Sequence, residues 1–138
     1  MDQPIPLTDN AFWIGVNDRT TDLFESIWPL PRGVSYNSYV LIDEKVAVID
    51  AVKKDFFGLF LEKLKTALNG RKVDYLIGSH LEPDHSGSYR LFREVFPEAA
   101  VVGNPKTRDF LKELYGMTDN FHLVHDGDTL DLGSRKLR

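Results

Sequence analysis

Residues 73–87 read Val-Asp-Tyr-Leu-Ile-Gly-Ser-His-Leu-Glu-Pro-Asp-His-Ser-Gly, an apolar run that leads into a tract of acids and histidines. The run 73–78 has the length and composition of a buried strand, and it delivers the chain to His80. In an extended segment His80, Glu82 and Asp84 would project to one side, while His85 would point elsewhere and could reach a second ion. The tract therefore predicts a dinuclear metal site.

The ligand types indicate which metal the tract would hold. The sequence contains no cysteine, so a metal must be bound through nitrogen and oxygen. All-histidine and thiolate sites favour zinc, whereas imidazole mixed with carboxylate suits iron or manganese. Glu82 is thus the residue that discriminates between these metals, and it favours iron or manganese.

Upstream of the tract, the sequence predicts strands. A first strand is expected over 11–16. Residues 35–42 alternate in the manner of a half-buried strand, and residues 46–49 form a short β-branched run. The tight turn at 43–45 makes these last two strands a hairpin that ends at Asp50.

A helix is expected next, with Asp55 as its N-cap and Gly70 at its C-terminal end. Its apolar residues recur at helical spacing and form one face: Phe57, Phe60, Leu61, Leu64 and Leu68.

Beyond the tract, strand and helix alternate. Ser86 or Ser88 could start a second helix that ends at Pro97. Residues 99–103 read as a buried strand, and Asn104 caps a third helix that ends at Gly116. The apolar positions of this third helix are Phe110, Leu111, Leu114 and Tyr115, and further strands are expected at 121–124 and 129–132. A hairpin followed by βαβαβ predicts an α/β fold with a mixed sheet.

Composition excludes several classes of protein. The length of 138 residues suits one domain, and a hydrophobic content of 42% is typical of a globular protein. The net charge is −4, and the sequence has no stripe of basic residues of the kind that binds nucleic acid. No apolar stretch approaches the roughly 20 residues that cross a bilayer. The N-terminus lacks the features of a signal peptide, so we expect a cytoplasmic protein that binds neither nucleic acid nor membrane.

The acidic-histidine tract resembles the metal motif of the metallo-β-lactamase superfamily, whose hydrolases usually carry a His-x-His-x-Asp-His loop. Glu82 replaces the second histidine, and this variant is typical of flavodiiron proteins, the reductases of oxygen and nitric oxide. Residues 32–39, 48–50 and 126–133 are also similar to segments of that family. The resemblance implies the αββα sandwich of the superfamily, a mixed sheet with helices on its outer face.

The resemblance also implies the roles of individual residues. His80 and Glu82 would ligate the iron nearer the flavin, and Asp84 and His85 the second iron. Asp50 is either a residue that supports the metal loop from behind or a simple turn residue. No residue of this chain is expected to bind FMN, which the family holds in a flavodoxin-like domain.

Three further ligands of the family have no counterpart that the sequence identifies. His122 and His125 come too early in the chain, so we expect them to be ordinary strand and turn residues. The chain is thus expected to be the N-terminal half of a metallo-β-lactamase-like domain, residues 1–138, with the C-terminal half and the flavodoxin-like domain absent. Alone it should be inactive.

Three functions are compatible with these residues. The leading interpretation is a diiron enzyme that reduces dioxygen to water or nitric oxide to nitrous oxide, with FMN as electron source, rubredoxin or a reductase as donor, and a homodimer as assembly. The first alternative is a hydrolase of the same fold, such as a thioesterase or a glyoxalase II-like enzyme, in which a metal-bound hydroxide attacks the substrate. The second is a non-catalytic oxygen sensor or binding module.

Overall fold

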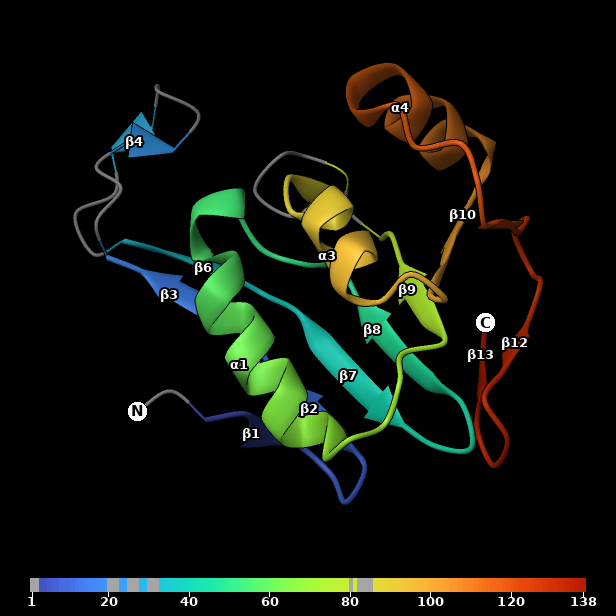
Figure 1. The fold of residues 1–138 in the computed structure, drawn as a ribbon, viewed down its shortest axis with the longest axis horizontal. Coiled ribbons are helices and arrows are strands. Elements are labelled where there is room, and N and C mark those ends of the chain that lie inside the picture. The colour runs from blue at the N-terminus through green and yellow to red at the C-terminus, as the bar shows by residue number, and fades with distance from the viewer. Residues whose placement is uncertain (1–2, 20–22, 25–27, 30–32, 80, 82–85) are drawn as a thin grey trace.

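The computed structural model describes residues 3–19, 23–24, 28–29, 33–79, 81 and 86–138, with side chains described for all of these except 23, 24, 28 and 29. Within this part of the chain the main sheet has seven strands (Figure 1). In spatial order they are β1 (Ile5–Pro6), β2 (Ala11–Trp13), β7 (Tyr39–Ile42), β8 (Val46–Ile49), β9 (Tyr75–Ile77), β10 (Ala100–Gly103) and β11 (Phe121–Leu123).

The sheet is mixed, as the sequence predicts. Strands β1, β2, β7 and β8 pair antiparallel, and β8 to β11 pair parallel. The turn at 43–45 is confirmed, because Ile42 lies opposite Val46. Since β8, β9, β10 and β11 run the same way, their carboxyl ends meet at one edge of the sheet, where functional groups gather in open α/β folds.

Two expected strands are each broken in the middle. The predicted strand 11–16 divides into β2 and β3 (Val16–Asp18), and the predicted strand 35–42 divides into β6 (Val34–Tyr36) and β7. β3 and β6 leave the main sheet and pair with each other. The break falls at Gly15, where a Cβ would lie 2.3 Å from the carbonyl oxygen of Tyr36, so only glycine permits this crossing.

The main core lies between the sheet and its helices, α1 (Phe57–Leu68), α3 (Tyr89–Val95) and α4 (Pro105–Tyr115), which pack on the same face. The predicted face of α1 is confirmed, because Phe60, Leu64 and Leu68 are buried in this core. α4 differs from its prediction at one position: Leu111 is buried, but Leu114 is 56% exposed.

The helix ends agree with the sequence in α4 and differ in α1. Asn104 caps α4 by accepting a hydrogen bond from the Thr107 N–H at 2.8 Å, and Gly116 ends the helix in a left-handed conformation. The N-cap prediction for Asp55 is wrong, because Asp55 lies inside a 3₁₀ turn, η1 (Lys54–Phe56), that precedes α1. The left-handed C-cap of α1 is Asn69, one residue before the predicted Gly70.

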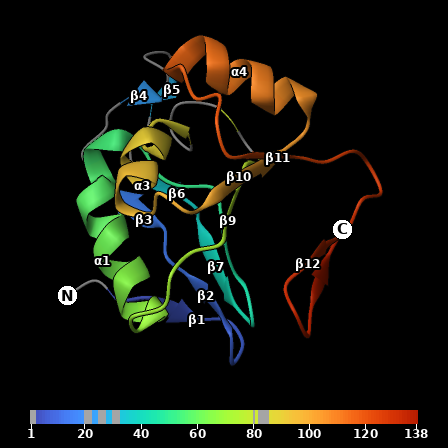
Figure 2. The ribbon, with the colours of Figure 1, turned by 45° about the vertical axis from the view of Figure 1, so that its right-hand side comes forward.

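A hairpin covers part of the opposite face of the sheet, as Figure 2 shows. It consists of β12 (Leu130–Asp131) and β13 (Lys136–Leu137). Leu130 and Leu132 pack there against Ala47 and Val102 in a second, smaller core. A further small ladder pairs β4 (Leu23–Phe24) with β5 (Trp28–Pro29). No helix in the described part of the chain has the length and apolar character to cross a membrane.

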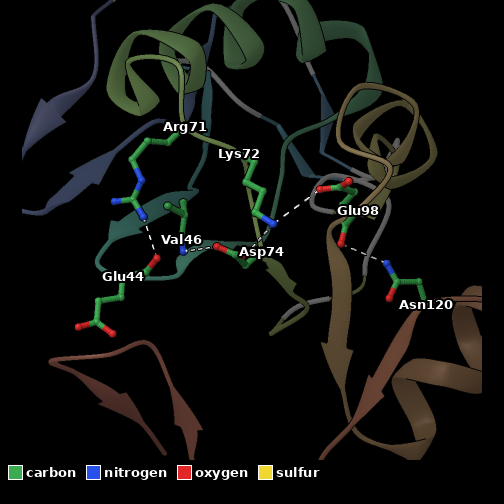
Figure 3. Close-up of polar contacts among 7 residues, drawn as sticks. All are labelled: Glu44, Val46, Arg71, Lys72, Asp74, Glu98 and Asn120. Carbon is green, nitrogen blue, oxygen red and sulfur yellow. Dashed lines mark hydrogen bonds and ion pairs between the residues drawn. The ribbon is translucent and has the colours of Figure 1, made fainter.

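Polar contacts fix the edge of the sheet at the amino ends of the parallel strands (Figure 3). The Asp74 carboxylate accepts a hydrogen bond from the Val46 N–H at 2.8 Å and so ties the segment before β9 to β8. Lys72 lies between Asp74 and Glu98, at 3.8 and 3.7 Å. Because Lys72 is exposed, these ion pairs contribute little stability, whereas the partly buried bond to Val46 fixes the register.

Candidate metal site

The predicted metal tract follows β9 at the carboxyl edge of the sheet, and we call residues 79–86 the metal loop. The structure describes Ser79, Leu81 and Ser86 of this loop. The predicted ligands lie outside the described residues: His80, Glu82, Asp84 and His85. The structure places the two ends of the loop and the side chains that contact them.

Asp50 holds the beginning of the loop. Its carboxylate accepts hydrogen bonds from the backbone N–H of Ser79 at 2.8 Å and from the Ser79 hydroxyl at 2.5 Å. Asp50 is buried and has a left-handed backbone with φ of 58°, an uncommon conformation that aspartate tolerates better than most residues. The charge-assisted hydrogen bonds from Ser79 to this carboxylate orient Ser79, the residue that directly precedes His80.

Tyr89 of α3 approaches the same carboxylate from the core. Its hydroxyl lies 3.4 Å from Oδ1 of Asp50. Burial raises the pKa of Tyr89 well above its ordinary value, and the negative charge of Asp50 raises it further. Tyr89 is therefore a neutral phenol at physiological pH, and its O–H donates toward Asp50.

The end of the loop is held from another direction. The Ser86 hydroxyl is fully buried and donates to the carbonyl oxygen of Leu81 at 2.7 Å. The hydroxyl of Tyr115, the last residue of α4, lies 3.0 Å from Ser86 Oγ. Ser79, Ser86, Tyr89 and Tyr115 were not predicted as site residues. The two serines flank the tract, and this position could have identified them from the sequence. No local sequence pattern identifies the two tyrosines.

A close approach of α4 brings its first turn to the same edge. A Cβ on Gly103, at the end of β10, would lie 2.5 Å from Cγ2 of Thr107, so a larger residue would push α4 away from the sheet. The glycine thus lets the helix pack directly over the carboxyl end of β10.

The two later histidines do not join a metal cluster within the described residues. His122 is exposed on β11, with its ring 6.2 Å from that of Tyr75, and His125 is exposed in the turn that follows. Among the side chains the structure describes, no group of three or more His, Asp or Glu residues could hold a metal ion. The expectation that both are ordinary strand and turn residues stays a prediction.

An apolar cavity of about 400 Å³ adjoins the beginning of the metal loop. It lies between the carboxyl edge of the sheet and the hairpin β12–β13, and its lining includes Ile77, Ser79, Val102 and Val124. A larger hollow of about 800 Å³ opens at the opposite edge of the sheet, beside Arg71 and Asp74. Among its charged side chains, Lys72 pairs with Asp74, and Arg71 donates to the backbone carbonyl oxygen of Glu44.

Comparisons with known proteins agree with this fold. The family model described as "ODP family beta lactamase" matches residues 34–138. A nitric oxide reductase of Moorella thermoacetica is 34% identical over 99% of this chain and 35% of its own length. The flavodiiron protein of Giardia intestinalis has a TM-score of 0.91 at 31% identity, over 99% of this chain and 33% of that one. Rubredoxin oxygen:oxidoreductase of Desulfovibrio gigas has a TM-score of 0.92 at 27% identity, over 97% and 34%.

The chain therefore spans about a third of the length of the relatives it matches. Their structures share its mixed sheet and helices, which confirms the predicted metallo-β-lactamase-like α/β fold. The names of these relatives favour the flavodiiron interpretation over the hydrolase alternative. Because the family model covers most of its length, this chain belongs to the ODP beta-lactamase family, among relatives that are flavodiiron proteins and nitric oxide reductases.

Proposed function

We propose that this chain forms the diiron-binding part of a flavodiiron oxidoreductase, which reduces dioxygen to water, nitric oxide to nitrous oxide, or both, with electrons from FMN. The names of its relatives, a nitric oxide reductase and a rubredoxin oxygen:oxidoreductase, support this reaction class. The observation that carries the proposal is the position of Ser79, the residue before His80, at the carboxyl edge of the sheet, where Asp50 is bonded to it.

In this proposal His80 and Glu82 hold one iron, and Asp84 and His85 hold the other. This donor set fits iron, because it combines imidazole nitrogen with carboxylate oxygen and contains no thiolate. A bound iron pair would supply two adjacent positions at which a diatomic molecule accepts electrons. The described residues contribute by orientation: Asp50 fixes Ser79, and the buried Tyr89 donates toward Asp50 and screens it from water.

The remaining features of the proposal concern the longer protein. FMN would bind in a flavodoxin-like domain outside residues 1–138, which we assign to the N-terminal half of the metal-binding domain. A rubredoxin or a reductase would supply electrons, and a homodimer would bring one subunit's flavin near the other's metals. A cytoplasmic location remains a prediction from the sequence.

An anaerobic titration with Fe²⁺ tests the ligand assignment. We predict that His80→Ala and Glu82→Ala each lower the affinity for Fe²⁺ at least about tenfold, since each removes one of few protein ligands. His122→Ala is the matched control, because His122 is exposed on β11, and it should bind iron as the unmodified chain does. Equal affinity in Glu82→Ala and the unmodified chain would contradict the proposal.

Iron content after desalting provides a second measurement. Two protein ligands per iron bind weakly, because full coordination and supporting contacts supply much of the affinity. We therefore expect the 138-residue chain to retain well under two irons, as judged by elemental analysis. Retention of both irons would mean that these four ligands suffice, contrary to our account of the site.

A further inference from the structure

The backbone of Asp50 is hydrogen-bonded at both its N–H and its carbonyl group. The N–H donates to the carbonyl oxygen of Ile77 at 2.8 Å and ties Asp50 to β9. The carbonyl oxygen of Asp50 accepts a hydrogen bond from the hydroxyl of Ser38, also at 2.8 Å. Ser38 is fully buried and Asp50 is only 6% exposed. A carbonyl group buried in this way needs a donor from the protein, because little water reaches it.

The bond from Ser38 forms where the backbone ladder between β7 and β8 ends. The last residues that this ladder pairs are Tyr39 and Ile49, so Ser38 and Asp50 occupy the next position on each strand. Asp50 has a φ of 58°, and a residue in this left-handed conformation cannot continue a strand. Its carbonyl oxygen meets a side-chain donor at this point, the Ser38 hydroxyl.

Ser38 is itself held in place by a neighbouring segment. Its backbone carbonyl oxygen accepts a hydrogen bond from the N–H of Ile14 at 2.9 Å, and Ile14 is fully buried in the main core. The serine side chain is short and has a single torsion between heavy atoms, with three staggered positions. A fixed backbone and a short side chain together make the Ser38 hydroxyl a donor with little freedom to move.

We propose that Ser38 is a positioning residue: it holds Asp50 in the left-handed conformation and so keeps the Asp50 carboxylate on Ser79. A left-handed aspartate costs energy and persists only where its surroundings fix it. The bond from Ser38 stabilises this conformation at the carbonyl group, and the carboxylate then accepts the N–H and the O–H of Ser79. Ser38 acts on the metal site only through Ser79, so its connection with metals rests on the proposed function.

NMR spectroscopy of the metal-free chain tests this role. In Ser38→Ala we expect the backbone amide of Ser79 to exchange about 3- to 10-fold faster with solvent, because a loosened Asp50 protects it less. The resonance of this amide proton should also move upfield, since its charge-assisted bond to the carboxylate is weakened. The Cα and Cβ resonances of Asp50, which report on its backbone conformation, should move away from their left-handed values.

Tyr36→Phe is the matched control. It removes another buried hydroxyl from the same stretch of chain, but this hydroxyl donates to Oδ2 of Asp18 at 2.8 Å and not to Asp50. Both variants lose a buried hydrogen bond, so the thermal midpoint should fall in both, while exchange at Ser79 should stay within about twofold in Tyr36→Phe. Changes at Ser79 and Asp50 that are confined to Ser38→Ala support the inference. Unchanged resonances and exchange in Ser38→Ala, or equal changes in Tyr36→Phe, overturn it.

Ser38→Cys keeps the test decisive if the alanine variant does not fold. A thiol has nearly the shape of the hydroxyl but is a weak donor, so we expect smaller changes at Ser79 and Asp50 in the same direction, and their absence overturns the inference. None of these measurements includes a metal, so their failure leaves the proposed function untouched. Equal iron affinity in Glu82→Ala and the unmodified chain would contradict the proposed function and leave the role of Ser38 intact.

Discussion

Asp50 illustrates how much of the site depends on single residues. Its backbone has a left-handed conformation that costs about 1 kcal/mol, and its carboxylate accepts two hydrogen bonds from Ser79 and one from Tyr89. The sequence left two interpretations of this residue, a supporting role and a simple turn. Its bonds to the start of the metal loop favour the supporting role, and we propose that it supports the metal ligands.

We predict that Asp50→Asn weakens the anchor of the loop. Asparagine keeps the size and tolerates the left-handed backbone, but it is neutral and accepts through one oxygen only. The free energy of unfolding, measured with urea, should fall by about 1–3 kcal/mol. Asp109→Asn on the exposed side of α4 is the control and should change it by less than about 0.5 kcal/mol, since its ion pair with Arg108 is exposed. Equal stability of the two variants would refute this role of the Asp50 charge.

For helices and strands, the sequence correctly predicted the features that depend only on neighbouring residues. Asn104 and Gly116 bound α4 as expected, because a cap and a left-handed glycine depend on neighbouring residues only. The breaks at Gly15 and within 35–42 were missed, since both segments read as continuous strands and the close approach of Gly15 to the Tyr36 carbonyl oxygen joins residues far apart in the sequence. For the same reason Asp50 could be proposed from its position after a strand, whereas Tyr115 could not be connected with Ser86.

The hairpin β12–β13 depends on one carboxylate of the turn between β7 and β8. Asp43 accepts hydrogen bonds from the Ser134 hydroxyl at 2.9 Å, the Ser134 N–H at 3.2 Å and the Arg135 N–H at 2.9 Å. A backbone bond from Lys45 to the Leu132 carbonyl, at 2.9 Å, is the second attachment. The contact between turn and hairpin is therefore sensitive to the charge of Asp43.

We predict that acid releases this hairpin. Burial alone would raise the pKa of Asp43 and is the largest single influence, but hydrogen bonds from Glu44, Ser134 and Arg135 together lower it from 3.8 to about 2. A pKa lowered in the folded state means that the contact is at full strength above about pH 4 and is lost as the pH falls through about 2. The amide resonances of Ser134 and Arg135, followed by NMR from pH 5 downward, should shift with a midpoint near 2.

Asp43→Asn provides the control for this titration. The shift of the Ser134 and Arg135 amides near pH 2 should disappear in this variant, and the amides of 130–137 should exchange faster at neutral pH because the charge assistance is gone. A midpoint near the ordinary value in the unmodified chain would show that these hydrogen bonds do not stabilise the carboxylate.

For the whole molecule, the two faces of the main sheet differ in how well they are covered. The helices cover one face, over the main core, whereas the hairpin β12–β13 packs over part of the other. Five apolar side chains on this second face are only half-buried in the described structure: Tyr39, Leu41, Ile49, Tyr75 and Ile77. An apolar surface of this kind favours association.

We predict that the 138-residue chain associates with itself through this face. Sedimentation velocity over a range of concentrations should give a weight-average mass that rises with concentration. Leu41→Lys should weaken association about tenfold or more, the effect of about 1.4 kcal/mol. Leu114→Lys on α4, where the side chain is already 56% exposed, is the control and should have little effect. A single monomeric species at every concentration would exclude this association.

The order of the strands in the main sheet has a consequence for the way the chain is made. Their positions in space, β1-β2-β7-β8-β9-β10-β11, follow their order of synthesis, so no strand has to insert between two earlier ones. During translation each new segment can add to an edge that already exists, and α1, α3 and α4 close over it in turn. The sheet can thus grow by one strand at a time during synthesis, and the metal loop emerges from the ribosome after β8 and the Asp50 that follows it.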